Sequence, residues 1–161
     1  MSPKVLKSIG CSLVELGHAE RRRLFGESNE EVAKKAQAVV RNGMTPQVCI
    51  GEKPKGTVEE AVEECRPQIE SVLATTDQEI IFAYEPVWAI GQSELASAEY
   101  VVGVTKALRM LCGERSLRIL YGGSAGPGTF QRMREGVDGL FLGRFGHDPR
   151  NVGLVVSEVG K

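Results

Sequence analysis

Short apolar runs alternate along this chain with longer segments in which apolar residues recur every third or fourth position. The short runs have the length and the flanking turn residues of buried β-strands. They predict five strands, at residues 12–16, 47–50, 80–84, 117–121 and 140–142. The longer segments predict helices, at residues 2–10, 28–41, 57–73, 97–112, 127–135 and 151–159.

Capping residues mark the ends of the two helices that follow the first two strands. Ser28 precedes a run of acidic residues and Asn42 precedes a glycine, so a helix is expected between them. Thr57 and Glu60 have the spacing of a capping box, which predicts the start of the next helix.

Two stretches interrupt the regular pattern. Pro67 lies inside a predicted helix, where it has no N–H to donate, so it is expected to kink that helix or to split it in two. The charged segment 20–23 is expected to lead the chain away from the first strand.

The alternation of strands and helices predicts one α/β domain with a parallel sheet and helices packed outside it. It does not by itself separate a barrel from an open doubly wound sheet. Both architectures place ligand sites at the C-terminal ends of the strands. Polar or small residues stand at those ends: His18, Glu52, Glu85, Ser124 and Gly143. The glycine-rich segment 122–126 is not followed by a lysine, so it is not a Walker loop, and no dinucleotide fingerprint follows the first strand.

Composition narrows the class of protein. The chain has 161 residues, of which 42% are hydrophobic and 25% charged, the profile of a globular domain with its own core. A net charge of -1 gives no support to binding of nucleic acid or of an anionic membrane. No apolar run approaches the roughly 20 residues of a membrane span, and no signal peptide is expected. The four cysteines are widely spaced and there are two histidines, so we expect reduced thiols in a cytoplasmic protein and no metal site.

Glu85 is the most informative residue of the pattern. It directly follows a buried strand, and Pro86 then forces the chain to turn. An apolar segment containing Trp88 comes next and ends at Gly91. This layout fits a base at a strand end with a hinged lid behind it. It equally fits an ordinary strand–loop junction with a partly buried tryptophan.

Five motifs resemble those of the triosephosphate isomerase family. Residues 84–91, Tyr-Glu-Pro-Val-Trp-Ala-Ile-Gly, resemble its signature. Residues 16–22, 25–27, 49–52 and 121–124 match further motifs in the expected order, so the resemblance covers nearly the whole chain. One departure is Ala19, where the family usually has serine.

The resemblance implies a TIM (β/α)8-barrel fold and a role for several residues. It makes Glu85 the catalytic base and His18 the electrophile, with Glu20 as a supporting carboxylate and Tyr121 as the latch of the lid. The lid would be Pro86, Val87, Trp88, Ala89 and Ile90, and the substrate phosphate would be held at Gly91, Ser124, Gly143 and Arg144. Without the resemblance, a lone histidine after a strand is more often structural, Glu20 could pair with the neighbouring arginines, and Tyr121 could be a strand-end aromatic.

The implied reaction interconverts glyceraldehyde 3-phosphate and dihydroxyacetone phosphate through an enediolate, without cofactor or metal. Two departures favour an alternative substrate. Arg144 stands where the family usually has a second glycine, and residues 92–94 are Gln-Ser-Glu where the lid usually continues Thr-Gly-Lys. They suggest a branch of the family acting on a tetrulose phosphate such as erythrulose phosphate. Family members are typically cytoplasmic homodimers of glycolysis and gluconeogenesis.

The resemblance also implies that residues 1–161 form a partial barrel, with five of eight strand–helix units and without the first three strands. The family's catalytic lysine, in an Asn-x-Lys motif, would belong to the part before Met1. An electrostatic group of that kind is worth roughly 3–4 kcal/mol, so the chain alone is expected to be slow. A third hypothesis is therefore a non-catalytic barrel fragment with a binding role.

Overall fold

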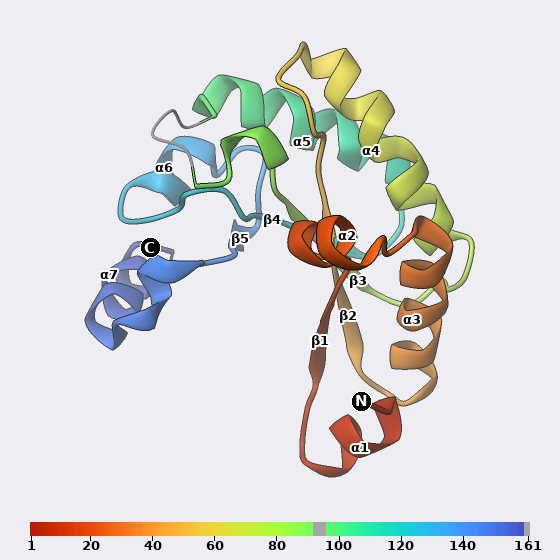
Figure 1. Cartoon of the computed structure of the whole chain (residues 1–161). Helices are drawn as coiled ribbons and strands as arrows, with labels where there is room; N and C mark the ends of the chain where they lie inside the picture. Colours follow the sequence, from red (N-terminus) through yellow and green to blue (C-terminus); the bar gives the residue numbers. More distant parts are fainter. Residues whose placement is uncertain (92–95, 160–161) are drawn as a thin grey trace.

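The computed structural model describes residues 1–91 and 96–159, and its centre is a parallel sheet of five strands in the order β1-β2-β3-β4-β5 (Figure 1). The strands are β1 Leu13–Leu16, β2 Thr45–Ile50, β3 Ile80–Tyr84, β4 Leu117–Tyr121 and β5 Gly139–Leu140. Every neighbouring pair is parallel. The sheet confirms the predicted α/β fold and matches part of a TIM barrel.

Helices connect the strands, and α3, α4 and α5 lie side by side along one face of the sheet (Figure 1). The α-helices are α1 Pro3–Ser8, α2 Ala19–Phe25, α3 Asn29–Arg41, α4 Val58–Leu73, α5 Ala98–Cys112, α6 Thr129–Met133 and α7 Pro149–Val159. Two short 3-10 helices, η1 Val87–Ala89 and η2 Arg144–His147, follow the strand ends of β3 and β5.

The predicted caps are present. The Ser28 side chain accepts from the Glu31 N–H while the Glu31 carboxylate accepts from the Ser28 N–H, and Thr57 and Glu60 form the same reciprocal box at α4. The prediction that Pro67 splits a helix is wrong, because α4 runs unbroken through it. Pro67 is exposed, while α4 packs between α3 and α5, so tertiary contacts hold the helix together across the missing hydrogen bond.

Most elements differ from the sequence-based expectation by one or two residues at an end, and β2 begins two residues earlier, at Thr45. The charged segment 20–23 belongs to helix α2, whose arginines are fixed by partners such as Glu27 and Asn29 rather than by a buried apolar stripe. Strand β5 is shorter and begins one residue earlier, at Gly139, and α6 covers only Thr129–Met133.

The two faces of the sheet differ in chemistry. In the register of β2, β3 and β4, the row Val48, Phe82 and Ile119 is buried and belongs to the core formed with the helices. The alternate row on the opposite face begins at Glu15 and continues through Gln47. Side chains along a strand point alternately to the two faces. Because Glu85 directly follows β3, this alternation places it on the face away from the helices.

Both edges of the sheet lack a further strand within the described residues. Leu13, at the β1 edge, is 43% exposed, and Leu154 and Val156 of α7 are 55% and 63% exposed near the β5 edge. Unpaired edges beside apolar surface can pair with another chain. Among the helices described, none is long and apolar enough to span a bilayer. All four cysteines are free.

Candidate active site

Glu85 lies at the ends of β2, β3 and β4, between two glycines. Any larger residue in place of either glycine would force neighbouring atoms to move. A Cβ at Gly51 would lie 1.8 Å from the carbonyl oxygen of Glu85, and one at Gly122 would lie 2.6 Å from its Cγ. The Glu85 N–H donates to the Ile50 carbonyl at 2.8 Å, which continues the sheet to this residue. The backbone of Glu85 is therefore fixed by the sheet and its side chain is directed between the neighbouring loops.

His18 faces Glu85 from the start of α2. As the N-cap residue, it accepts a hydrogen bond on Nδ1 from the Glu20 N–H, at 3.3 Å. A ring nitrogen that accepts carries no proton, so this bond places the ring proton on Nε2. The Nε2 atom lies 3.8 Å from Oε2 of Glu85, and the His18 side chain is 29% exposed. A donor is thus aimed into the space beside the carboxylate.

The Glu85 carboxylate is buried and poorly satisfied. The residue is 4% exposed, and its Oε2 has no hydrogen-bond partner among the described residues. Burial, and next the negative charge of Glu15, raise the pKa of Glu85 to about 7, while the Cys49 thiol acts in the opposite direction. A carboxylate with a pKa near neutrality is suited to taking and returning a proton.

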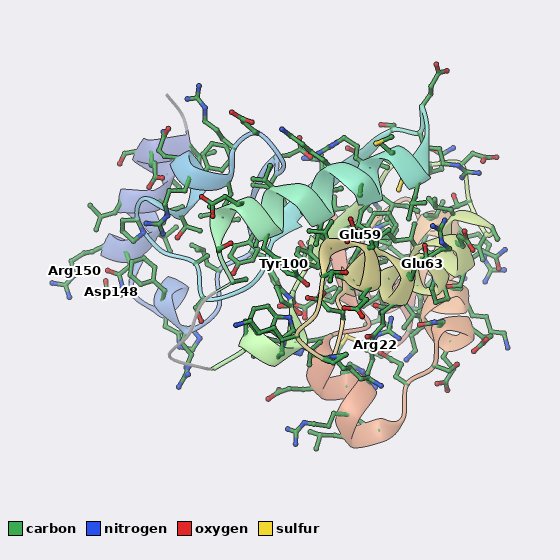
Figure 2. All side chains as sticks on the ribbon, turned by 90° about the horizontal axis from the view of Figure 1, so that it is seen from above. Arg22, Glu59, Glu63, Tyr100, Asp148 and Arg150 are labelled. Atoms are coloured by element: carbon green, nitrogen blue, oxygen red, sulfur yellow. The ribbon has the colours of Figure 1, made fainter. Side chains whose placement is uncertain are left out.

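The segment expected to form the lid is attached to a second buried carboxylate, Glu52. Its Oε1 accepts from the Trp88 indole at 2.7 Å, from the Tyr100 hydroxyl at 2.9 Å and from the Tyr84 hydroxyl at 3.2 Å. Tyr100 comes from the first turn of α5 (Figure 2), and its ring meets that of Trp88 edge to face at 5.9 Å. The sequence placed Glu52 at a strand end but gave no sign of this convergence, because the three donors lie 32 to 48 residues away.

The remaining lid residues surround the short helix η1. Pro86 is its N-cap, and the Val87 N–H donates to the Glu52 carbonyl at 2.9 Å. Ala89 is buried and Ile90 is 37% exposed. The Gln-Ser-Glu segment 92–94, which departs from the family pattern, lies outside the described residues.

The residues expected to hold a phosphate lie at the same end of the sheet, on exposed backbone. Gly91 closes η1 with φ +70°, Ser124 follows β4, and Gly143 directly precedes η2, which starts at Arg144. Arg144 is exposed, and its guanidinium makes no hydrogen bond or ion pair within the described part of the chain. The chain thus offers backbone N–H groups and one cation at this end.

Two other predicted site residues, Glu20 and Tyr121, lie beside His18 and beside the glycine-rich loop after β4. Glu20 gives His18 its backbone N–H, whereas its carboxylate is exposed and forms no bond within residues 1–91 and 96–159. Tyr121 is 1% exposed, and a Cβ at Gly123 would lie 2.1 Å from its hydroxyl oxygen. In the described residues no hydrogen bond joins that hydroxyl to the lid.

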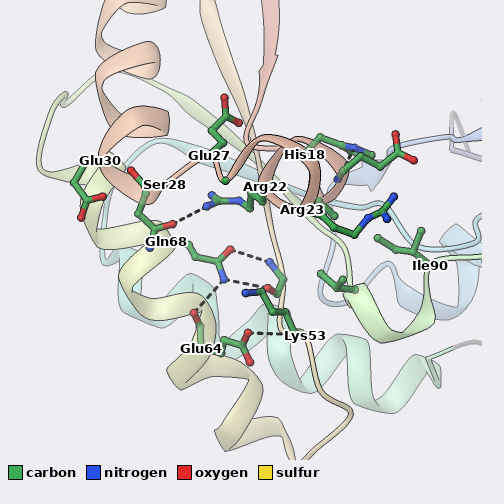
Figure 3. Close-up of a pocket in the computed structure, with 16 residues that line it drawn as sticks. His18, Arg22, Arg23, Glu27, Ser28, Glu30, Lys53, Glu64, Gln68 and Ile90 are labelled. Atoms are coloured by element: carbon green, nitrogen blue, oxygen red, sulfur yellow. Dashed lines mark hydrogen bonds between the residues drawn. The ribbon is translucent and has the colours of Figure 1, made fainter.

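A groove of about 1140 Å³ opens beside His18 (Figure 3). The start of α3, the loop after β2, one side of α4 and the lid residues Val87 and Ile90 line it. Gln68 fixes its floor, because its side-chain amide accepts from the Gly51 N–H at 3.1 Å and donates to the Gly51 carbonyl at 3.0 Å. In the part of the chain that is described, no group of three His, Cys, Asp or Glu residues is arranged to hold a metal ion.

Comparison with known proteins gives one consistent result. The family model described as triosephosphate isomerase matches residues 1–159. A protein of Pectobacterium atrosepticum named L-erythrulose-1-phosphate isomerase is 43% identical over 167 residues, which cover 98% of this chain and 64% of that protein. A Listeria monocytogenes protein named probable triosephosphate isomerase 2 is 38% identical over 165 residues, covering 95% and 65%. A Rhizobium etli protein named L-erythrulose-1-phosphate isomerase is 41% identical over 160 residues, covering 89% and 58%. The chain spans less than two thirds of the length of these relatives.

Proposed function

The chain belongs to the triosephosphate isomerase family, and on this premise we propose that it carries the base and the electrophile of an aldose–ketose isomerase. The observation that supports this most strongly is the pair formed by Glu85 and His18. A buried carboxylate with a pKa of about 7 faces, at 3.8 Å, the imidazole nitrogen that the Glu20 N–H leaves as the donor. The pair combines a proton acceptor with a hydrogen-bond donor in one cleft.

In the proposed reaction, Glu85 removes a proton from the carbon next to the substrate carbonyl. His18 donates a hydrogen bond, and then a proton, to the carbonyl oxygen and so stabilises the enediolate that forms. Glu85 then returns the proton to the former carbonyl carbon, while the proton of the neighbouring hydroxyl group moves by way of His18 to the former carbonyl oxygen. The neighbouring carbon becomes the new carbonyl, so no net proton or electron is exchanged with solvent. A glutamate base beside a neutral histidine is the established arrangement of the triosephosphate isomerase family itself.

We assign the supporting roles on the same premise. Backbone N–H groups near Gly91, Ser124 and Gly143, with Arg144 beside them, would hold the phosphate. Residues 86–90 would close over the substrate and Tyr121 would latch them, with Glu20 supporting His18. The chain would form one domain equivalent to five of the eight units of a barrel, within a cytoplasmic homodimer.

Triose phosphate and a tetrulose phosphate are both candidate substrates. The names of the relatives favour the tetrulose phosphate, which the sequence suggested as the alternative. The proteins from Pectobacterium and Rhizobium, at 43% and 41% identity, are named for L-erythrulose 1-phosphate, and the Listeria protein, at 38%, for triosephosphate. The cation at Arg144 and the altered lid sequence point the same way. We therefore propose a tetrulose phosphate as the substrate and triose phosphate as the second candidate, the latter placing the protein in glycolysis and gluconeogenesis.

Isomerisation of both sugar phosphates by the purified chain, with Glu85→Gln as the paired variant, tests the proposal. We expect turnover on the tetrulose phosphate to exceed turnover on the triose phosphate, and to fall by roughly 10³-fold in the variant, because general bases contribute about 10²–10⁴-fold. Exposed Glu63→Gln is the matched control and should leave the rate unchanged. Turnover of neither substrate would support the non-catalytic hypothesis instead.

A further inference from the structure

A second, much smaller cavity lies directly beside Glu85. It measures about 20 Å³, and its wall is formed by the ends of β1, β2 and β3 and the first turn of α2, including Gly17, Ala19, Arg22, Cys49 and Glu85. Two of these residues each have a buried polar atom, Nη2 of Arg22 and Oε2 of Glu85. Neither atom has a hydrogen-bond partner among the described residues. One of the unpaired atoms belongs to a cation and the other to a carboxyl group.

The Arg22 guanidinium is fixed so that only Nη2 remains available. Its Nε donates to the Gly17 carbonyl at 2.8 Å and its Nη1 to Oδ1 of Asn29 at 2.8 Å. A Cβ built on Gly17 would lie 3.1 Å from Nη2, so this nitrogen sits against a residue of the cavity wall. Two anchored nitrogens on a planar group leave the third little freedom to turn elsewhere.

The cavity has the size and the chemistry for one water molecule. A buried water needs about 10–15 Å³ of accessible space and two to four polar partners. We propose that this cavity binds a single water, which accepts a hydrogen bond from Nη2 of Arg22 and donates one to Oε2 of Glu85. The Ala19 methyl group on the same wall can supply neither bond, which leaves both to the water. Arg22 is then a positioning residue for the carboxylate.

The charges around Glu85 explain what this bridge does. From β1, Glu15 disfavours the ionised carboxylate, and from β2 the Cys49 thiol favours it. From α2, His18 faces the same oxygen at 3.8 Å, while Arg22 itself interacts with Glu27 and Cys49. A bridging water would add a donor and the influence of a cation, both of which favour the ionised form. The bridge thus lowers the pKa of Glu85 relative to what burial alone would give.

The test measures the pKa of Glu85 directly, by ¹³C NMR titration of its carboxyl carbon in the whole chain. We expect Arg22→Met to raise that pKa by about one pH unit, since hydrogen bonds to charged groups are worth about 1.5–3 kcal/mol and one unit is about 1.4 kcal/mol. Arg23→Met is the matched control, because Arg23 has the same charge one residue later and does not line this cavity. An unchanged pKa in Arg22→Met would overturn the proposal.

Two further measurements sharpen the test, and the first does not depend on the stability of that variant. A high-resolution crystal structure of the unmodified chain should show one ordered water within hydrogen-bond distance of both atoms, and a cavity without it would refute the bridge. In Ala19→Ser the new hydroxyl should displace the water, so adding Arg22→Met should then shift the pKa by less than half as much. An equal shift in both backgrounds would mean that Arg22 acts through its charge alone. The inference uses the proposed function only in taking Glu85 as the base, and because no readout requires turnover, either can fail separately.

Discussion

Glu52 and Glu85 follow neighbouring strands, carry the same functional group and are equally inaccessible, with exposures of 1% and 4%. Their surroundings differ. In both residues Oε2 has no hydrogen-bond partner among the described residues. Oε1 of Glu52, however, accepts three hydrogen bonds, from Trp88, Tyr100 and Tyr84, whereas the side-chain donor that reaches Glu85 is the weak Cys49 thiol. Burial alone therefore does not distinguish a carboxylate that holds segments together from one that is reactive. The distinction comes from whether the donors that a buried carboxylate needs are supplied by the fold.

The two carboxylates also have opposite effects on the stability of the fold. Glu52 joins the end of β2, the lid and α5 through one atom, so its loss should loosen three segments at once. Glu85 is held in a position that raises the free energy of its charged form, which is a cost to folding and an advantage to proton transfer. Three variants sharpen or break this comparison.

The largest effect is expected for Glu52→Ala. The variant leaves two hydroxyls and one indole N–H without their acceptor, and each unsatisfied buried donor costs about 1–3 kcal/mol. We expect the free energy of unfolding to fall by roughly 4 kcal/mol, measured by urea denaturation at pH 7. Glu63→Ala removes an exposed carboxylate from α4 and should leave the free energy of unfolding nearly unchanged. Equal losses in the two variants would remove the proposed difference between satisfied and surface carboxylates.

The next effect concerns the pH dependence of stability in Glu85→Gln. The pKa of Glu85 rises from its ordinary value of 4.5 to about 7 on folding, so between these pH values the native chain binds more protons than the unfolded chain. Stability from this group is therefore complete below pH 4.5 and is lost as the pH rises through 7. Relative to the native protein, the glutamine variant should gain up to about 3 kcal/mol between pH 4.5 and pH 8, measured by denaturation at each pH. Exposed Glu20→Gln should show no such trend, and a parallel pair of curves for Glu85→Gln would contradict the assigned pKa.

The smallest effect is expected for Tyr100→Phe. This change removes one of the three donors to Glu52 and keeps the ring that meets Trp88, so the cost should be about 1 kcal/mol. Differential scanning calorimetry would report it as a lower melting temperature. Tyr84→Phe is the matched variant at the same acceptor. A loss in Tyr100→Phe as large as that of Glu52→Ala would mean that the single bond from Tyr100, and not the convergence of three donors, accounts for the contribution of Glu52.

Local signals in the sequence were enough to predict the strands and most helix ends. Ser28 and Thr57 act within one turn of their helices, so their spacing to Glu31 and Glu60 is a sufficient signal. The place of Glu85 at a strand end could be predicted in the same way, because a buried apolar run stops at a proline. The motif resemblance then added His18, which no periodicity singles out.

The features that escaped prediction all depend on contacts between distant segments. Helix α2 has no buried residue and is fixed by side-chain partners, so its charged sequence carried no helical pattern. The effect of Pro67 was overestimated because the packing of α4 between its neighbours could not be known. The donors to Glu52 and the cavity beside Arg22 arise from four or more segments that only the sheet brings together.

The two glycines that flank the base limit how such a protein can change during evolution. A side chain at Gly51 or Gly122 would collide with Glu85 itself, so these positions are closed to variation as long as the base is needed. Ser124 and Arg144, by contrast, are exposed. If Glu85 is the base, as we propose, substrate preference can change by mutation at exposed positions of the site while the proposed reaction step stays the same.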